Sequence, residues 1–231
     1  MDGLDTVTGP AAIAHVEPLT TLGAKLQPSH TALIVVDIQN DFCAEGGMMD
    51  NEGRDLSAVQ AMADRLPRLI ADARRVGALV VFIRNVYSSE GNKYLSDVWL
   101  EQASRRRGES YWKRPVCALG SWEGDFYGDV RPQPGDPVVT KHRFSAFHNT
   151  DLELVLRTNG IRTMVMAGVA SNVCVETTAR EGFVRDFYIA FLEDGSATYD
   201  EDQHAATLRT IDSYFGQVVK VDDVLREWAD A

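Results

Sequence analysis

The chain has 231 residues, of which 45% are hydrophobic and 25% charged, so its composition is that of a folded globular protein and excludes global disorder. Acidic residues outnumber basic ones by 34 to 23, and the resulting net charge of −11 repels phosphate backbones and disfavours nucleic acid as a partner. No apolar run approaches the roughly 18 residues of a membrane span, and the first residues lack the features of a signal peptide. With three widely spaced cysteines, the composition therefore favours a cytoplasmic protein with free thiols and no membrane partner.

The N-terminal residues 1–28 show no sustained period, and we interpret them as an arm that precedes a single domain over residues 29–231. In that domain, short apolar runs alternate with helical patterns. The expected strands cover residues 32–36, 79–83, 137–140, 163–167, 187–192 and 217–221. The expected helices cover residues 55–75, 151–159, 171–185 and 200–214, with a last helix at the C-terminus.

This alternation predicts an α/β fold in which helices cover both faces of a six-stranded parallel sheet. Gly77 is expected to end the first long helix. Residues 85–135 form an irregular stretch rich in Trp, Tyr, Gly and Pro. Because so long a stretch inside a compact domain usually has a function, we expect it to cover a site.

Three residues whose side chains could take part in catalysis follow expected strands. Asp37 ends the first strand, Lys141 ends the third, and Cys174 falls in the first turn of the helix after the fourth. Because ligands of open parallel sheets bind beyond the carboxyl ends of the strands, we expect these side chains to meet at one edge. A helix N-terminus and a nearby lysine would stabilise a thiolate at Cys174, and Asp37 could accept the thiol proton.

Each of these three residues also has a purely structural interpretation. A lone Asp at a strand end is more often a cap, a lone Lys is more often a surface residue, and a lone Cys is more often a small buried hydrophobe. A flavin- or nucleotide-binding module is disfavoured because neither G-x-G-x-x-G nor G-x-x-x-x-G-K-[ST] occurs. A serine hydrolase is disfavoured because no G-x-S-x-G elbow occurs.

Three sequence motifs, in this order, resemble those of the isochorismatase-like cysteine hydrolases. They are the run ALIVVDIQNDF at residues 32–42, Lys141, and the run GVASNVCVETTAR at residues 168–180. The stretches at 141–150 and 172–178 look most like the ureidoacrylate amidohydrolase and biuret hydrolase branch. The resemblance extends from about residue 30 to the C-terminus.

The resemblance implies a three-layer α/β/α fold and a catalytic triad of Asp37, Lys141 and Cys174. It also implies a cis peptide between Val169 and Ala170, with the backbone N–H groups of Ala170 and Cys174 forming an oxyanion hole. The implied activity is hydrolysis of a C–N bond in a small ureido or amide compound through a thioester, with release of ammonia or carbamate. A catalytically inactive relative is the alternative.

Two departures from other branches narrow the expected chemistry. The metal-binding nicotinamidases of this family carry an Asp-x-His element after the second strand, whereas this chain has RNVYS at residues 84–88, so we expect no metal and no other cofactor. The members that cleave isochorismate lack the cysteine nucleophile, which this chain has at Cys174. The resemblance further suggests a homodimer or homotetramer.

Candidate substrate-binding residues lie close to the triad in the sequence or in the irregular stretch. Asn40 and Phe42 follow Asp37, and Tyr87 and Arg143 follow the second and third strands. Asn40 could instead cap the loop, and Tyr87 could be a core residue. The same uncertainty applies to two further aromatic residues, Trp112 and Phe147, and to two further cation donors, His142 and His148.

Overall fold

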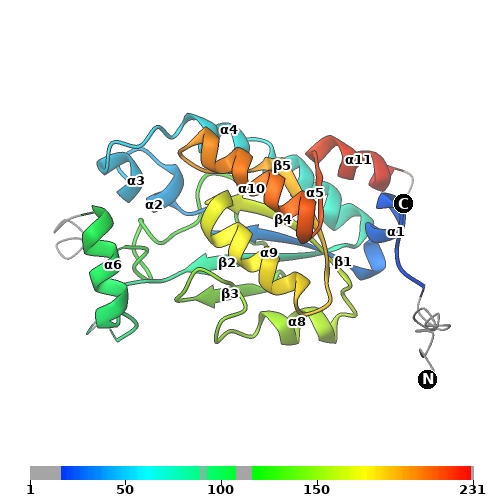
Figure 1. Cartoon of the computed structure of the whole chain (residues 1–231), viewed down its shortest axis with the longest axis horizontal. Helices are drawn as coiled ribbons and strands as arrows, with labels where there is room; N and C mark the ends of the chain where they lie inside the picture. The colour runs from blue at the N-terminus through cyan, green and yellow to red at the C-terminus, as the bar shows by residue number, and fades with distance from the viewer. Residues whose placement is uncertain (1–16, 89–90, 92, 108–115, 230–231) are drawn as a thin grey trace, which may run out of the picture.

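The computed structural model of the chain describes residues 17–88, 91, 93–107 and 116–229. Figure 1 shows a twisted sheet between two layers of helices. The strands are β1 (Thr31–Val36), β2 (Leu79–Asn85), β3 (Val138–Lys141), β4 (Thr163–Val169), β5 (Tyr188–Ala197) and β6 (Gln217–Val219). All neighbouring strands pair in parallel, in the order β3-β2-β1-β4-β5-β6. The predicted six-stranded parallel sheet is therefore confirmed.

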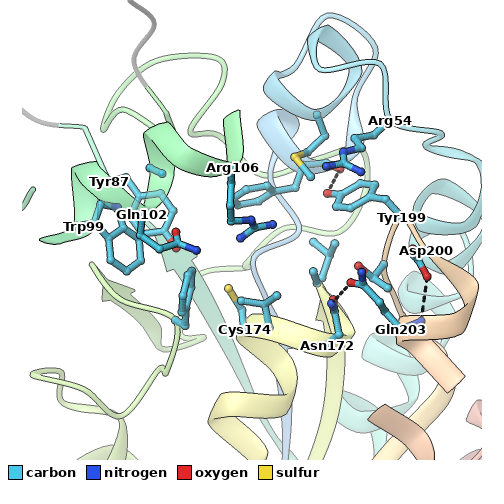
Figure 2. Close-up of a pocket in the computed structure, with 18 residues that line it drawn as sticks. Arg54, Tyr87, Trp99, Gln102, Arg106, Asn172, Cys174, Tyr199, Asp200 and Gln203 are labelled. Carbon is cyan, nitrogen blue, oxygen red and sulfur yellow. Dashed lines mark hydrogen bonds between the residues drawn. The ribbon is translucent and has the colours of Figure 1, made fainter. Parts of the chain in front are cut away.

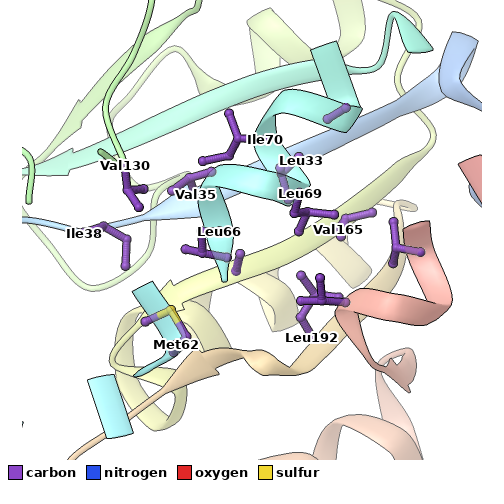
Figure 3. Packing of buried hydrophobic residues seen from close by; sticks show 14 of the residues in the cluster. Leu33, Val35, Ile38, Met62, Leu66, Leu69, Ile70, Val130, Val165 and Leu192 are labelled. Atoms are coloured by element: carbon purple, nitrogen blue, oxygen red, sulfur yellow. The ribbon is translucent and has the colours of Figure 1, made fainter. Parts of the chain in front are cut away.

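The helices pack on both faces of the sheet because every other residue of the buried strands points to the same face. Leu33 and Val35 of β1 pack with α4 (Ser57–Ala63), α5 (Leu66–Val76) and α11 (Val221–Ala229), as Figure 3 shows in part. The intervening β1 residues pack with the helices of the other face. Those helices are α8 (Leu152–Thr158), α9 (Glu176–Phe183) and α10 (Glu201–Tyr214).

The prediction of a single helix over residues 55–75 is wrong, since two helices, α4 and α5, cover this stretch. Pro67 lies in the first turn of α5. A proline has no backbone N–H and its ring clashes with the preceding turn, so it is tolerated at a helix start but not in a continuous helix. The predicted end is confirmed, because Gly77 caps α5 in a left-handed conformation with φ of 80°.

The interpretation of residues 85–135 as irregular throughout is also wrong, because α6 (Asp97–Arg107) lies within this stretch. The hydroxyl of Ser96 accepts a hydrogen bond from the backbone N–H of Trp99 and thereby caps the helix. Figure 1 shows that α6 lies beyond the carboxyl end of β2, away from the helix layers. Its position explains why its charged and apolar residues do not follow the pattern of a helix packed on a sheet.

The described part of the expected N-terminal arm packs against the domain. It contains the short helix α1 (Leu22–Lys25) and ends in a 3₁₀ turn, Pro28–His30. Leu26 is buried, and its carbonyl accepts a hydrogen bond from the indole N–H of Trp228 in α11. Residues 1–16 of the arm lie outside the described part. Among the described helices, none is long and apolar enough to cross a bilayer.

Candidate active site

Asp37 directly follows β1 and is fully buried, in a left-handed backbone conformation with φ of 54°. Its backbone N–H donates to the carbonyl of Ile83 in β2 at 3.1 Å. The side-chain amide of Gln39 reinforces this position, since it donates to the carbonyls of Asn85 and Gly124 at 3.0 and 2.8 Å and accepts from the N–H of Asn85. The end of β1 is therefore tied to the end of β2 and to the loop that follows α6.

Lys141 is the last residue of β3, the edge strand next to β2. Its long side chain extends past the end of β2, so that Nζ lies 2.7 Å from Oδ2 of Asp37 and 3.5 Å from Sγ of Cys174. The ammonium also donates to the carbonyl of Arg143 at 3.1 Å. Lys141 has no solvent exposure. It therefore forms a buried ion pair with Asp37 and, from the same ammonium, a hydrogen bond to the sulfur of Cys174.

Cys174 lies in a single wide (π) turn, Ser171–Val175, which connects β4 to α9. The peptide bond between Val169 and Ala170, just before this turn, is cis, as the resemblance implies. The hydroxyl of Thr178 donates to the carbonyl of Cys174 at 2.7 Å. The three predicted residues, far apart in the sequence, thus meet at the carboxyl edge of the sheet.

Burial sets the protonation of this site. Burial raises the pKa of the Cys174 thiol to about 12, although Lys141 partly opposes the shift. Lys141 thus lowers the thiol pKa in the direction that the sequence predicts, but desolvation of the thiolate outweighs this effect. Burial also raises the pKa of Asp37 above its usual range, against the attraction of Lys141. Burial alone would lower the pKa of Lys141, but Asp37 and Cys174 together raise it.

A cavity of about 130 Å³ opens directly above Cys174. Figure 2 shows Tyr87, Trp99 and Gln102 on one side of it, and Tyr199, Asp200 and Gln203 on the other. Its polar and charged lining residues are Arg54, Gln102, Arg106, Asn172, Thr198, Asp200 and Gln203. Its apolar and aromatic lining residues include Phe42, Met49, Tyr87, Trp99, Phe144, Val169, Ala170 and Val173. The cavity gives a small, partly aromatic ligand access to the sulfur.

Two of the four candidate substrate-binding residues line this cavity, namely Phe42 and Tyr87. Asn40 does not line it, because its side-chain amide donates to the carbonyl of Trp122 at 2.7 Å and so fixes a loop. Arg143 does not line it either. Its guanidinium donates to the carbonyls of Tyr94 and His142 and stacks over the ring of Trp99, 5.2 Å from the centroid.

The other candidates lie elsewhere. Phe147 is part of the core and stacks on Phe187. His142 and His148 line a separate surface hollow next to Arg143. Trp112 lies outside the described residues.

Sequence reasoning missed the contribution of α6, which places Trp99, Gln102 and Arg106 in the cavity wall. The signal that could have found this helix is Ser96 as an N-cap, followed by eleven residues without Gly or Pro. It also missed Asn172, whose amide nitrogen donates to Gln203 at 2.5 Å. The buried amide oxygen of Asn172 has no hydrogen-bond donor among the described residues.

The part of the chain that the structure describes contains no cluster of metal-ligating side chains. No three His, Cys, Asp or Glu side chains there lie close enough together to hold an ion. The arrangement around Cys174 instead combines a thiol, a buried base and a buried cation. These groups can form and stabilise a thiolate next to a carbonyl.

Comparisons of the sequence and of the structure with known proteins agree with each other. The isochorismatase domain family matches residues 31–223. A ureidoacrylate amidohydrolase RutB of Variovorax paradoxus (strain S110) is 38% identical over 228 residues, which cover 94% of this chain and 87% of the relative.

Solved structures with the same fold include a cysteine hydrolase from Pseudomonas syringae pv. phaseolicola 1448A, with a TM-score of 0.77 and 26% identity, over 93% of this chain and 98% of the other. They also include an N-carbamoylsarcosine amidase from Thermoplasma acidophilum, with a TM-score of 0.64 and 25% identity, over 84% and 97% of the two chains.

Proposed function

Because the chain belongs to the isochorismatase family, to which residues 31–223 match, we propose that it is a cysteine amidohydrolase that cleaves a C–N bond of a small ureido or amide compound. The observation that carries this proposal is the position of the Lys141 ammonium, 2.7 Å from Asp37 and 3.5 Å from the sulfur of Cys174. The names of the relatives, a ureidoacrylate amidohydrolase and an N-carbamoylsarcosine amidase, support a substrate of the ureido class.

The first half of the proposed reaction forms a thioester. The resting thiol is protonated, so Asp37 must take its proton as the sulfur attacks the carbonyl carbon. The S–C bond forms, and the carbonyl electrons move to oxygen. When the tetrahedral adduct collapses, the C–N bond breaks and the leaving amine takes the proton from Asp37. Lys141 stabilises the carboxylate of Asp37 before the proton transfer and the negative charge on sulfur as the thiol loses its proton.

The second half of the reaction releases the acyl group. Asp37 takes a proton from a water molecule, and the resulting hydroxide attacks the thioester carbonyl. The C–S bond then breaks, and the sulfur regains the proton that Asp37 holds. The product is a carboxylic acid from an amide or a carbamate from a ureido compound. Ammonia is a common readout for a ureido compound, because it either leaves when the terminal C–N bond breaks or forms with carbon dioxide when an unsubstituted carbamate breaks down.

We propose that the backbone N–H groups of Ala170 and Cys174 stabilise the oxyanion formed in both steps. Both residues line the cavity, and both belong to the segment that follows the cis peptide. Loss of one oxyanion donor typically costs about 3 kcal/mol of transition-state stabilisation. The aromatic rings of Phe42 and Tyr87, which line the cavity, are placed to contact the flat faces of the ureido group.

The test is ammonia release from a panel of ureido compounds and primary amides, measured for the wild type and for Cys174→Ser. We expect the wild type to turn over at least one ureido compound, and the variant to lose roughly a thousandfold or more in kcat while remaining folded. Cys43→Ala is the matched control, because Cys43 is buried and does not line the cavity. Near wild-type rates in Cys174→Ser would exclude Cys174 as the nucleophile.

The proposal includes a cytoplasmic homodimer or homotetramer. Exposed apolar side chains in the segment around α6 support contacts between copies, since Val98 is 74% exposed and Leu119 is 66% exposed. Free thiols at Cys43, Cys117 and Cys174 fit a reducing compartment. Size-exclusion chromatography with light scattering tests the assembly, and a monomer at all concentrations would contradict it.

A further inference from the structure

The cavity above Cys174 is cationic at one end, although the chain carries a net charge of −11. Its lining contains two arginines, Arg54 and Arg106, and a single carboxylate, Asp200. Asp200 is partly engaged as the cap of α10, where its side chain accepts from the N–H of Gln203 at 3.0 Å. The remaining positive charge is therefore local to the cavity, in a molecule whose overall field repels anions.

Arg106 is the better placed of the two cations. It extends from α6 into the cavity, and Figure 2 shows it on the opposite wall from Cys174. No carboxylate or carbonyl pairs with its guanidinium in the part of the chain that the structure describes. Arg54 lies further round the rim, beside Tyr199.

The position of α6 is fixed by contacts that leave Arg106 available. Trp99 of this helix lies against Tyr87, with ring centroids 5.0 Å apart, and against Phe144, at 4.8 Å. The guanidinium of Arg143 covers the same indole. Arg143, the cation that the sequence suggested for a substrate carboxylate, thus anchors the helix that carries Arg106.

We infer that Arg106 binds a carboxylate on the substrate and selects carboxylated ureido compounds over uncharged ones of the same size. This inference rests on the proposed function and narrows its substrate class. A guanidinium presents paired N–H donors that match the two oxygens of a carboxylate. The substrate then spans the cavity, with its ureido carbonyl at Cys174 and its carboxylate at Arg106.

The first experiment compares two ureido compounds of similar size, 3-ureidopropionate and the uncharged 3-ureidopropanol. For Arg106→Gln, we expect kcat/KM for the carboxylate to fall roughly 10- to 100-fold, mainly through KM, because the contact is present in both ground and transition states. The value for the alcohol should stay within about threefold of wild type. Arg106→Lys should recover part of the loss.

Arg105→Gln is the matched control. Arg105 is the neighbouring residue on α6 and is exposed, as Arg106 is, but its guanidinium lies 3.8 Å from Glu101 and does not line the cavity. It should leave both substrates unchanged. Equal losses for both substrates in Arg106→Gln would overturn the inference, as would a selective loss confined to Arg54→Gln.

A second experiment needs no turnover and therefore separates this inference from the proposed function. Iodoacetate and iodoacetamide differ in charge, and both alkylate a thiol with loss of iodide. The ratio of their rates at Cys174, followed on its peptide by mass spectrometry, should fall about tenfold in Arg106→Gln and not in Arg105→Gln. If the wild type hydrolyses no compound of the ureido and amide panel, the proposed function fails while this ratio still decides the role of Arg106. An unchanged ratio overturns it.

Discussion

At the scale of single residues, the central feature is a cysteine that rests as a thiol. Burial raises the pKa of Cys174 to about 12, so the thiol keeps its proton at neutral pH even though Lys141 lies next to it. In the proposed reaction, the sulfur becomes reactive when its proton moves to Asp37, whose pKa burial also raises. A carboxylate with a raised pKa is a stronger base, and this suits it to the proton transfer.

The activity should therefore depend on pH through Asp37. As a general base, Asp37 must be deprotonated, so kcat/KM should fall as the pH is lowered through its raised pKa. We expect the midpoint of this acid limb to lie above 3.8, the ordinary value for an aspartate. The measurement is the pH profile of kcat/KM on a ureido substrate. A profile that stays flat down to pH 3.8 would contradict this role.

At the scale of the elements, close packing of β1 against β4 places the two halves of the site next to each other. Val36, the residue before Asp37, pairs with Gly168 of β4. Gly168 has φ of 118°, and a Cβ atom there would lie 2.1 Å from the carbonyl oxygen of Val36. Only glycine fits this contact, which brings the strand end that bears Asp37 close to the turn that bears Cys174.

Gly168→Ala should consequently damage both stability and activity. The combined strain and overpacking should lower the free energy of unfolding by about 3 kcal/mol or more. The measurement is urea denaturation followed by circular dichroism. The control is Gly23→Ala in α1, where the new Cβ would meet only the flexible end of Glu227. A Gly168→Ala variant as stable as the control would show that the close approach is not required.

The elements also show what a sequence can and cannot predict here. The strands were predictable because continuous apolar runs such as 32–36 and 164–167 are typical of parallel strands that are buried on both faces. Asp37, Lys141 and Cys174 were predictable because they follow such runs. The helix α6 was not, since it packs beside the cavity rather than on the sheet, and its sequence lacks a regular apolar face. The cavity residues Arg106 and Gln102 were missed with it.

At the scale of the whole molecule, an acidic α/β domain holds a small cavity with a cationic wall at the carboxyl edge of its sheet. The order of the strands places β1 and β4 side by side, with their onward connections running in opposite directions across the sheet. Open parallel sheets bind ligands at such a point. The fold therefore dictates where the site lies, and the loops and α6 determine what it accepts.

The proposed reaction uses no metal, so removal of metals should not affect it. Treatment with a chelator followed by dialysis should leave kcat within about twofold of the untreated enzyme. The reason is the donor set at the site, which consists of one thiol, one carboxylate and one ammonium. A loss of activity that added zinc or manganese restores would overturn this expectation and the interpretation of residues 84–88.

The most direct test is to trap the acyl group on the sulfur. The wild type is mixed with a ureido substrate, quenched with acid during turnover and digested for peptide mass spectrometry, and a parallel sample contains hydroxylamine. We predict a carbamoyl-type adduct on the peptide that contains Cys174 and formation of the corresponding hydroxyurea. Turnover with an unmodified Cys174 peptide and no hydroxyurea would contradict the account.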